Sequence, residues 1–177
     1  MSTRTLMTAA EFERLPDDGN QHELDEGELI VMPPPQYRHG RIQARIAQLL
    51  ANFAQKRKLG EVATECGFRL ADDTIRGPDV VFTRHERLAE MDFDRYSTSA
   101  PDLVIEILSP DANARQLNRK VGQYLKSQVH TVWVLDPHSE TVNVYQKDAV
   151  KMLGPDDTID APDLLPGFSA TVRSFFE

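Results

Sequence analysis

The sequence predicts an α/β (α+β) fold in which one central mixed β-sheet is flanked by helices. A short apolar run at residues 103–108 lies between Pro101 and Pro110, which is typical of a strand buried on both faces. A second strand is predicted at residues 131–136, and the helix between the two strands has the length of a crossover connection. We therefore expect these two strands to be parallel, within a sheet whose other elements follow in mixed order.

The chain begins with the pattern of a short helix and a hairpin. Thr8 and Glu11 have the spacing of a capping box, which predicts a short helix that stops at Pro16. Residues 22–32 predict a hairpin that turns at 25–27 and is ended by three consecutive prolines.

A long helix and several strands are predicted after the hairpin. Residues 39–59 form the clearest helix, which Gly60 is expected to end. Its apolar stripe consists of Ile42, Ile46, Leu49, Leu50 and Phe53. The later predicted elements are strands at 61–70 and 78–83, a helical turn near Leu88, a helix at 113–127, a half-exposed strand at 142–146 and a short final element. If the 142–146 strand has an unpaired edge, that edge is a candidate interface.

The composition is that of an ordinary globular protein. Of the 177 residues, 40% are hydrophobic and 27% are charged, which suits one domain over residues 1–177 with its own core. The N-terminus lacks a signal-peptide pattern, and no segment approaches the roughly 20 apolar residues of a membrane span. Cys66 is the only cysteine, which excludes an intrachain disulfide and a cysteine-based zinc site. We therefore expect a cytoplasmic protein that does not bind membranes.

The net charge of −8 restricts how the protein can contact nucleic acid. Proteins that bind DNA usually present a basic face. Any contact with DNA must therefore be local, or depend on a metal ion or a second subunit. No helix-turn-helix or zinc-finger pattern is present. The same acidic charge also favours solubility.

Glu106 most needs an explanation, because it is the single ionisable residue inside the apolar run. Burying a lone carboxylate is costly unless it is paired, protonated or bound to a metal. Two more ionisable residues lie where the pattern predicts burial. Asp79 begins another short apolar strand, and Lys120 flanks the apolar stripe of the helix at 113–127. Two acids and one lysine can thus converge at one end of the sheet.

Such a trio has a plain chemical use. Carboxylates on adjacent strands form a hard-oxygen site for Mg²⁺ or Mn²⁺. Magnesium keeps several waters, and one of them can attack a phosphate whose growing charge the metal offsets. A neighbouring lysine can orient or deprotonate that water, or stabilise the pentavalent phosphate. The reaction class these groups favour is phosphodiester hydrolysis.

Seven short segments, spread over nearly the whole chain, together form a family pattern. They are His22-Glu23-Leu24 with Gly27-Glu28, His39 at a helix start, Arg76-Gly77-Pro78-Asp79-Val80, residues 101–110, Lys120 with Tyr124, Trp133 with Asp136-Pro137, and Leu165-Pro166-Gly167-Phe168. In this order they resemble the Uma-two family of restriction-endonuclease-like proteins, in the PD-(D/E)XK nuclease superfamily. The resemblance implies a restriction-endonuclease-like core, DNA as substrate, magnesium (or manganese) as cofactor and, by nuclease analogy, a homodimer.

The resemblance also implies roles for particular residues. Asp79 and Glu106 match the two metal-binding acids of the superfamily pattern. The usual lysine stands two residues after the second acid, where this chain has Leu108, so Lys120 is expected to be the migrated lysine. Two acids of the early hairpin and one histidine are expected to join the site: Glu23 and Glu28 as further metal ligands, and His39 from the long helix. One departure from the family pattern is Gln116, which stands where an acid often precedes the helical lysine.

Each site residue also has a plainer interpretation. Glu106 can be a structural carboxylate paired with a buried arginine or lysine. Lys120 can extend its amine into water, and Asp79 can simply stabilise a turn, as aspartates commonly do. Glu23 and Glu28 can lie on a solvated face beside the hairpin turn.

Three more residues near these motifs have a structural interpretation, which for His39 stands beside the expectation that it joins the site. His39 begins a helix, Asp102 enters the buried strand, and Tyr124 belongs to the core. Strict alternation nevertheless places Asp102 on the same face as Glu106.

Two alternatives to a DNA endonuclease remain open at the level of function. One is a catalytically degenerate nuclease fold that acts as a binding or assembly module, which the acidic charge favours modestly. The other is hydrolysis of a smaller phosphodiester, which needs no basic groove.

Overall fold

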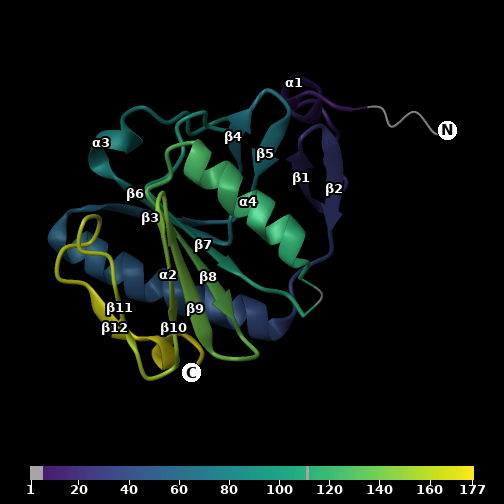
Figure 1. The fold of residues 1–177 in the computed structure, drawn as a ribbon. Helices are drawn as coiled ribbons and strands as arrows, with labels where there is room; N and C mark the ends of the chain where they lie inside the picture. The colour runs from purple at the N-terminus through teal and green to yellow at the C-terminus, as the bar shows by residue number, and fades with distance from the viewer. Residues whose placement is uncertain (1–5, 111) are drawn as a thin grey trace.

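A six-stranded mixed β-sheet forms the centre of the molecule (Figure 1). The computed structural model describes residues 6–110 and 112–177. The strand order is β10-β9-β8-β7-β6-β3. The strand bounds are β3 Gly60–Thr64, β6 Val80–Arg84, β7 Leu103–Ile107, β8 Thr131–Asp136, β9 Thr141–Gln146 and β10 Ala149–Leu153. β7 and β8 pair in parallel and the other neighbours pair antiparallel, which confirms the predicted mixed sheet and its parallel pair.

Helix α4, Ala114–Lys126, is the crossover between β7 and β8. Its N-cap is Asn113, whose side chain accepts hydrogen bonds from two backbone N–H groups of the first turn. Its apolar face buries Val121 and Tyr124 against the sheet, in contact with apolar side chains such as Val104 of β7. The sheet face beneath α4 is the one that carries the site described below.

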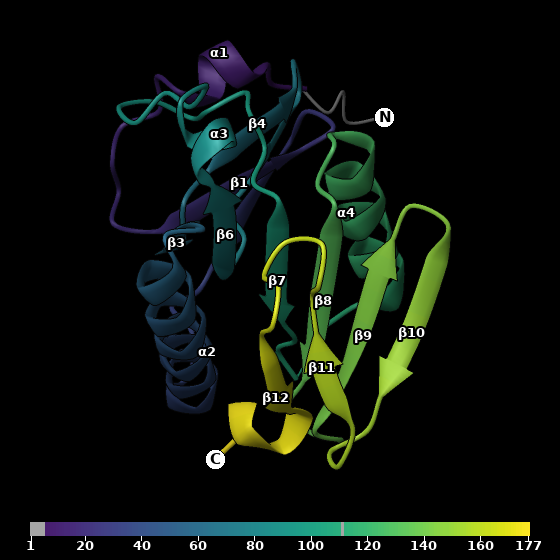
Figure 2. The same ribbon diagram turned by 90° about the vertical axis from the view of Figure 1, so that its left-hand side faces the viewer.

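The opposite face of the sheet is covered by helix α2, Tyr37–Arg57, and by the C-terminal segment (Figure 2). Ile105 and Ile107 belong to this second core, whereas Val104 between α4 and the sheet belongs to the first. Side chains alternate between the two faces of a strand, so Glu106 points toward α4.

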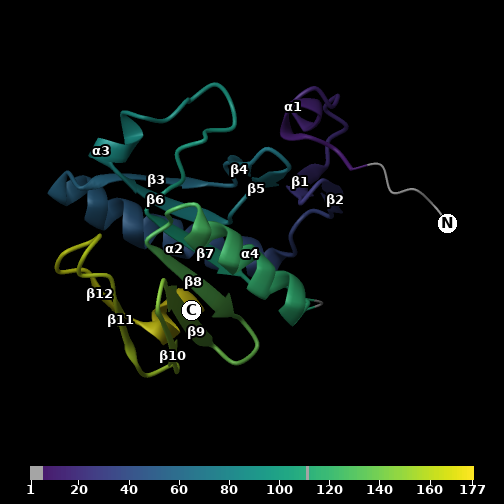
Figure 3. The same ribbon diagram turned by 45° about the horizontal axis from the view of Figure 1, so that its top comes forward.

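A second, four-stranded sheet and helix α1, Ala9–Phe12, lie at one end of the molecule (Figure 3). Its order is β2-β1-β5-β4, with β1 Gln21–Asp25, β2 Glu28–Met32, β4 Phe68–Ala71 and β5 Thr74–Arg76. The predicted capping box of α1 is present at Thr8. The β1–β2 hairpin turns at Glu26 and Gly27, whose φ angles of 50° and 84° are both left-handed, as a two-residue type I′ turn requires.

The remaining elements are short. They are α3 His85–Leu88, β11 Thr158–Asp160, β12 Ser169–Thr171 and the 3₁₀ helix η1 Val172–Phe175. Phe168 and Phe175 stack on Trp133 of β8, with ring centroids 6.3 and 6.1 Å apart, so the C-terminal segment completes the core over that face. Among the helices that the structure describes, none has the length and apolar character needed to cross a membrane.

Two predicted boundaries are wrong for the same physical reason. Helix α2 ends at Arg57, where Lys58 adopts a left-handed conformation with φ of 56°, and Gly60 instead opens β3. The strand predicted at 61–70 is two strands, β3 and β4, which belong to different sheets. Glu65 lies between them with φ of 56°. Non-glycine residues rarely adopt this conformation, and the sequence pattern gives no warning of it.

The condition set for an interface at the edge of the 142–146 strand is not met. β9 has partners on both sides, β8 and β10. The edge strand on this side of the sheet is β10, which the sequence reasoning missed together with β5, β11 and β12. These four strands are only three to five residues long, so their alternation is too brief to stand out.

Candidate functional site

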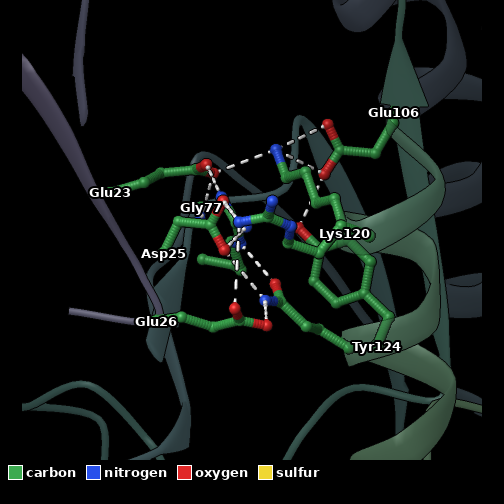
Figure 4. Close-up of polar contacts among 10 residues, drawn as sticks. Glu23, Asp25, Glu26, Gly77, Glu106, Lys120 and Tyr124 are labelled. Atoms are coloured by element: carbon green, nitrogen blue, oxygen red, sulfur yellow. Dashed lines mark hydrogen bonds and ion pairs between the residues drawn. The ribbon is translucent and has the colours of Figure 1, made fainter. Parts of the chain in front are cut away.

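Glu106 lies beneath α4, where two side chains of that helix contact its carboxylate (Figure 4). The Nζ atom of Lys120 is 2.9 Å from Oε2, and the hydroxyl of Tyr124 donates to Oε1 at 2.6 Å. Lys120 and Tyr124 are four residues apart on one helix and therefore project in the same direction. The Glu106 carboxylate is thus buried and paired rather than alone.

The pKa of Glu106 is raised from 4.5 to about 7. Burial is the largest cause, because it disfavours the charged form of a carboxyl group. The ammonium of Lys120 opposes this rise, while the negative charges of Asp79 and Glu23 add to it. At Glu106, the charge of Lys120 therefore does not offset burial and the neighbouring acids. A buried carboxylate whose pKa lies near neutral pH is typical of a functional site.

Lys120 lies between two carboxylates that belong to different sheets (Figure 4). Its Nζ atom is also 2.9 Å from Oε1 of Glu23, on β1. Although burial lowers the pKa of Lys120, the charges of Glu106 and Glu23 outweigh that effect and raise it. The ammonium therefore stays charged at neutral pH.

Glu23 is buried, and both of its carboxylate oxygens have polar partners. Besides Lys120, it accepts hydrogen bonds from the Arg76 guanidinium at 2.9 Å and from the backbone N–H of Gly77 at 2.9 Å. Burial acts to raise the pKa of Glu23, but Lys120 and Arg76 reverse that effect and lower it. Glu23 is therefore the ionised partner of Lys120, whereas Glu106 is the partner that more readily takes a proton.

Arg76 is a second buried cation of this network. It is buried, and it pairs with Asp25 at 2.5 Å as well as with Glu23. Its Nε donates to the side chain of Gln123 at 2.8 Å, and Gln123 in turn donates to Asp25 at 2.9 Å. Sequence reasoning missed these partners. One signal in the sequence could have indicated them: Arg76 ends the short run Thr74–Arg76. If that run is buried, its guanidinium needs acids around it.

Asp79 lies directly before β6, next to the strand that carries Glu106. Val80 pairs with Ile105, so one further step of the same register places Asp79 opposite Glu106. Opposite residues of an antiparallel pair project from the same face of the sheet. The backbone N–H of Ile107 donates to Oδ2 of Asp79 at 2.6 Å. The structure thus brings Asp79, Glu106 and Lys120 together.

The other predicted residues differ in how they relate to this cluster. His39 reaches it from α2, with Nε2 3.3 Å from Oδ1 of Asp79, and this hydrogen bond is the main cause that raises the pKa of His39. Glu28 begins β2 and pairs in register with Asp25, on the same face of the hairpin. Asp102 lies at the opposite end of β7, where it accepts from the backbone N–H of Arg84 at 2.8 Å and from its guanidinium at 2.9 Å.

The donor set of Asp79 and Glu106 suits a hard divalent cation. Within residues 6–110 and 112–177, no three side chains of the types His, Cys, Asp and Glu form a group that could hold a metal. Magnesium does not need three, because it commonly binds through one or two carboxylates and keeps several waters. Two carboxylates therefore fit Mg²⁺ or Mn²⁺, whereas Glu23 is committed to Arg76, Gly77 and Lys120.

The family model Uma2, which is described as "Putative restriction endonuclease", matches residues 9–173 of this chain. The chain belongs to the Uma2 family. The short sequence segments that resemble this family contain the main residues of the site, which are Glu23, Asp79, Glu106, Lys120 and Tyr124.

A solved structure gives independent support for the fold of this Uma2 protein. The chain is similar to a crystal structure from Anabaena variabilis described as "a putative nuclease belonging to DUF820", with a TM-score of 0.84 and 24% sequence identity. The match covers 96% of this chain and 97% of that one. At this identity the likeness shows the fold alone. No curated protein sequence matches the chain.

Proposed function

We propose that this Uma2 protein is a metal-dependent endonuclease that hydrolyses phosphodiester bonds of DNA. One observation carries the proposal: Asp79, directly before β6, lies opposite Glu106 of the neighbouring strand β7, and the ammonium of Lys120 is 2.9 Å from Glu106. The Uma2 membership supports the same reaction class, as does the resemblance to the PD-(D/E)XK superfamily.

Asp79 and Glu106 are the residues that would hold the metal. A bound Mg²⁺ or Mn²⁺ would supply an activated water and charge stabilisation at the scissile phosphate. Glu106 contributes a carboxylate that Tyr124 and Lys120 orient from one side. Asp79 contributes a carboxylate whose Oδ2 is fixed by the backbone of Ile107.

Lys120 would act as a charged donor rather than as a general base. Glu106 and Glu23 raise its pKa, so its amine keeps its proton at neutral pH. A charged amine beside Glu106 can orient the attacking water or stabilise the negative charge of the phosphate in the transition state. Deprotonation of the water by Lys120 is disfavoured on the same grounds.

DNA as the substrate and a homodimeric state are further parts of the proposal. The net charge of −8 means that contact with DNA must be confined to the surroundings of the site, or shared with a second subunit. Multi-angle light scattering of the purified protein, with and without DNA, measures the oligomeric state directly.

The test is metal-dependent cleavage of supercoiled plasmid and of single-stranded DNA. The wild type is compared with Asp79→Asn and Glu106→Gln, which remove charge but keep side-chain size. Asp160→Asn serves as the matched control, because Asp160 is an exposed carboxylate on β11, away from the site. We expect cleavage with Mg²⁺ or Mn²⁺ in the wild type and the control, and a loss of at least about 100-fold in the two site variants.

The other outcomes identify the alternatives. Equal cleavage by all four proteins would show a contaminating nuclease and overturn the proposal. DNA association without cleavage, and without Mn²⁺ binding in calorimetry, would favour the binding module. Cleavage of bis-p-nitrophenyl phosphate that needs Asp79 and Glu106, with no cleavage of DNA, would favour a smaller phosphodiester as the substrate.

A further inference from the structure

Asp79 is contacted from α2 by two polar side chains that are one helical turn apart. His39 contacts its carboxylate, with Nε2 3.3 Å from Oδ1. Gln43 contacts its main chain, with Nε2 donating to the carbonyl oxygen at 3.0 Å. Residues four apart on a helix lie on the same face, so α2 presents both groups toward Asp79.

His39 also links Asp79 to the strand of Glu106. The same Nε2 atom is 3.2 Å from the carbonyl oxygen of Ile107, the residue after Glu106. The N–H of Ile107 donates to the other carboxylate oxygen of Asp79 at 2.6 Å. Both oxygens of Asp79 therefore have a partner, and the carboxylate is prevented from rotating.

The contacts also define which nitrogen of the His39 imidazole carries a hydrogen. The carbonyl oxygen of Ile107 can only accept, and the Asp79 carboxylate accepts as well, so Nε2 of His39 must carry a hydrogen and donate it. Nδ1 is buried and has no hydrogen-bond partner among the described residues. A ring nitrogen that donates to Asp79 has no free lone pair for a metal. His39 is therefore placed to hold the Asp79 carboxylate, and it cannot bind a metal through Nε2 while it does so.

We propose that His39 is a positioning residue that fixes the orientation of the Asp79 carboxylate, and thereby sets the affinity of the site for a divalent cation. This inference rests on the proposed function, because it takes Asp79 as a metal ligand. Outer residues that orient metal ligands typically change metal affinity 10- to 100-fold when they are replaced. Gln43 holds the backbone of Asp79 instead, and the N–H of Glu65 also donates to that carbonyl oxygen, at 3.3 Å.

The experiment measures the dissociation constant of Mn²⁺ by calorimetry on the full chain, with no substrate present. His39→Phe removes the donor, whereas His39→Gln places an amide N–H where the imidazole Nε2–H lies. We expect His39→Phe to weaken Mn²⁺ binding 10- to 100-fold and His39→Gln to restore it to within about threefold. Gln43→Met, from the same face of α2, is expected to stay within about threefold and to lower only the thermal stability. If His39→Phe does not fold, His39→Asn replaces it, because its shorter amide does not reach the Nε2 position.

Each of the other outcomes would overturn a specific part of this proposal. Wild-type affinity in His39→Phe, together with loss of binding in Asp79→Asn, would overturn the role of His39 and leave the metal site standing. Equal weakening in His39→Gln and His39→Phe would overturn a positioning role in favour of direct ligation by the imidazole. Equal weakening in Gln43→Met would show that the backbone of Asp79, and not its carboxylate, is what α2 controls. Unchanged binding in Asp79→Asn would overturn the proposed metal site, and this inference with it.

Discussion

Replacing Glu106 by glutamine should stabilise the metal-free protein at pH 8. The pKa of Glu106 is raised from 4.5 to about 7. One pKa unit corresponds to about 1.4 kcal/mol, so ionisation of Glu106 destabilises the folded state by about 3 kcal/mol at pH 8. Glutamine resembles the protonated acid and avoids this cost. Its amide cannot satisfy Lys120 as well as a carboxylate does, so we expect a gain of about 1–3 kcal/mol.

The sign of the pH dependence follows from the raised pKa. Between pH 4.5 and about 7 the folded state binds more protons at Glu106 than the unfolded state does, so the wild type loses stability as pH rises through this window. The difference between Glu106→Gln and the wild type should therefore be small near pH 4.5 and reach its full size above pH 7.

Urea unfolding in EDTA at pH 5, 6, 7 and 8 measures this difference directly. A variant that is less stable than the wild type at pH 8 would refute the reasoning. So would a difference that does not change with pH, because it could not come from ionisation of Glu106.

Three further predictions concern neighbouring charges. Asp102→Asn should lower the free energy of unfolding by about 3 kcal/mol in the same urea assay, because Asp102 is buried between arginines, and should leave Mn²⁺ affinity unchanged. Arg76→Met should cost about 3–5 kcal/mol, because it strands the buried carboxylates of Glu23 and Asp25, and an unchanged unfolding midpoint would contradict this. Lys120→Met should tighten Mn²⁺ binding by removing a competing positive charge, yet slow DNA cleavage by about 100-fold or more in single-turnover assays. Weaker Mn²⁺ binding, or cleavage at the wild-type rate, would count against the role given to this lysine.

The fold could be predicted best where burial and periodicity agree. The run around Glu106 is apolar on both faces, and the following helix has a clear apolar stripe, so β7, α4 and β8 were found with their parallel pairing. The break between β3 and β4 depends on the left-handed backbone of Glu65, which hydrophobic periodicity does not encode.

The three central residues of the site and their convergence could be predicted, but their detailed contacts could not. Asp79, Glu106 and Lys120 each stand out as charges where burial is expected. Glu23 and His39, which contact Lys120 and Asp79, came from the family resemblance, but the roles of Tyr124 and Arg76 were missed for a physical reason. Tyr124 fits the apolar stripe of α4 as well as any core residue, and nothing in its sequence position shows that its hydroxyl is 2.6 Å from Glu106. Such contacts depend on the docking of elements that lie far apart in the chain.

The position of Lys120 between the two sheets has a consequence for the order of folding. Glu23 belongs to the first hairpin, while Lys120 lies on a helix formed from the second half of the chain. Their contact requires that the small sheet has already docked on α4. An incompletely folded chain therefore lacks the arrangement that places Lys120 beside both Glu106 and Glu23. Under the proposed function, a nascent or partly unfolded molecule would have no assembled site with which to cut nucleic acid. The ion pair between Lys120 and Glu23, which joins the two sheets, would thus tie the proposed activity to completed folding.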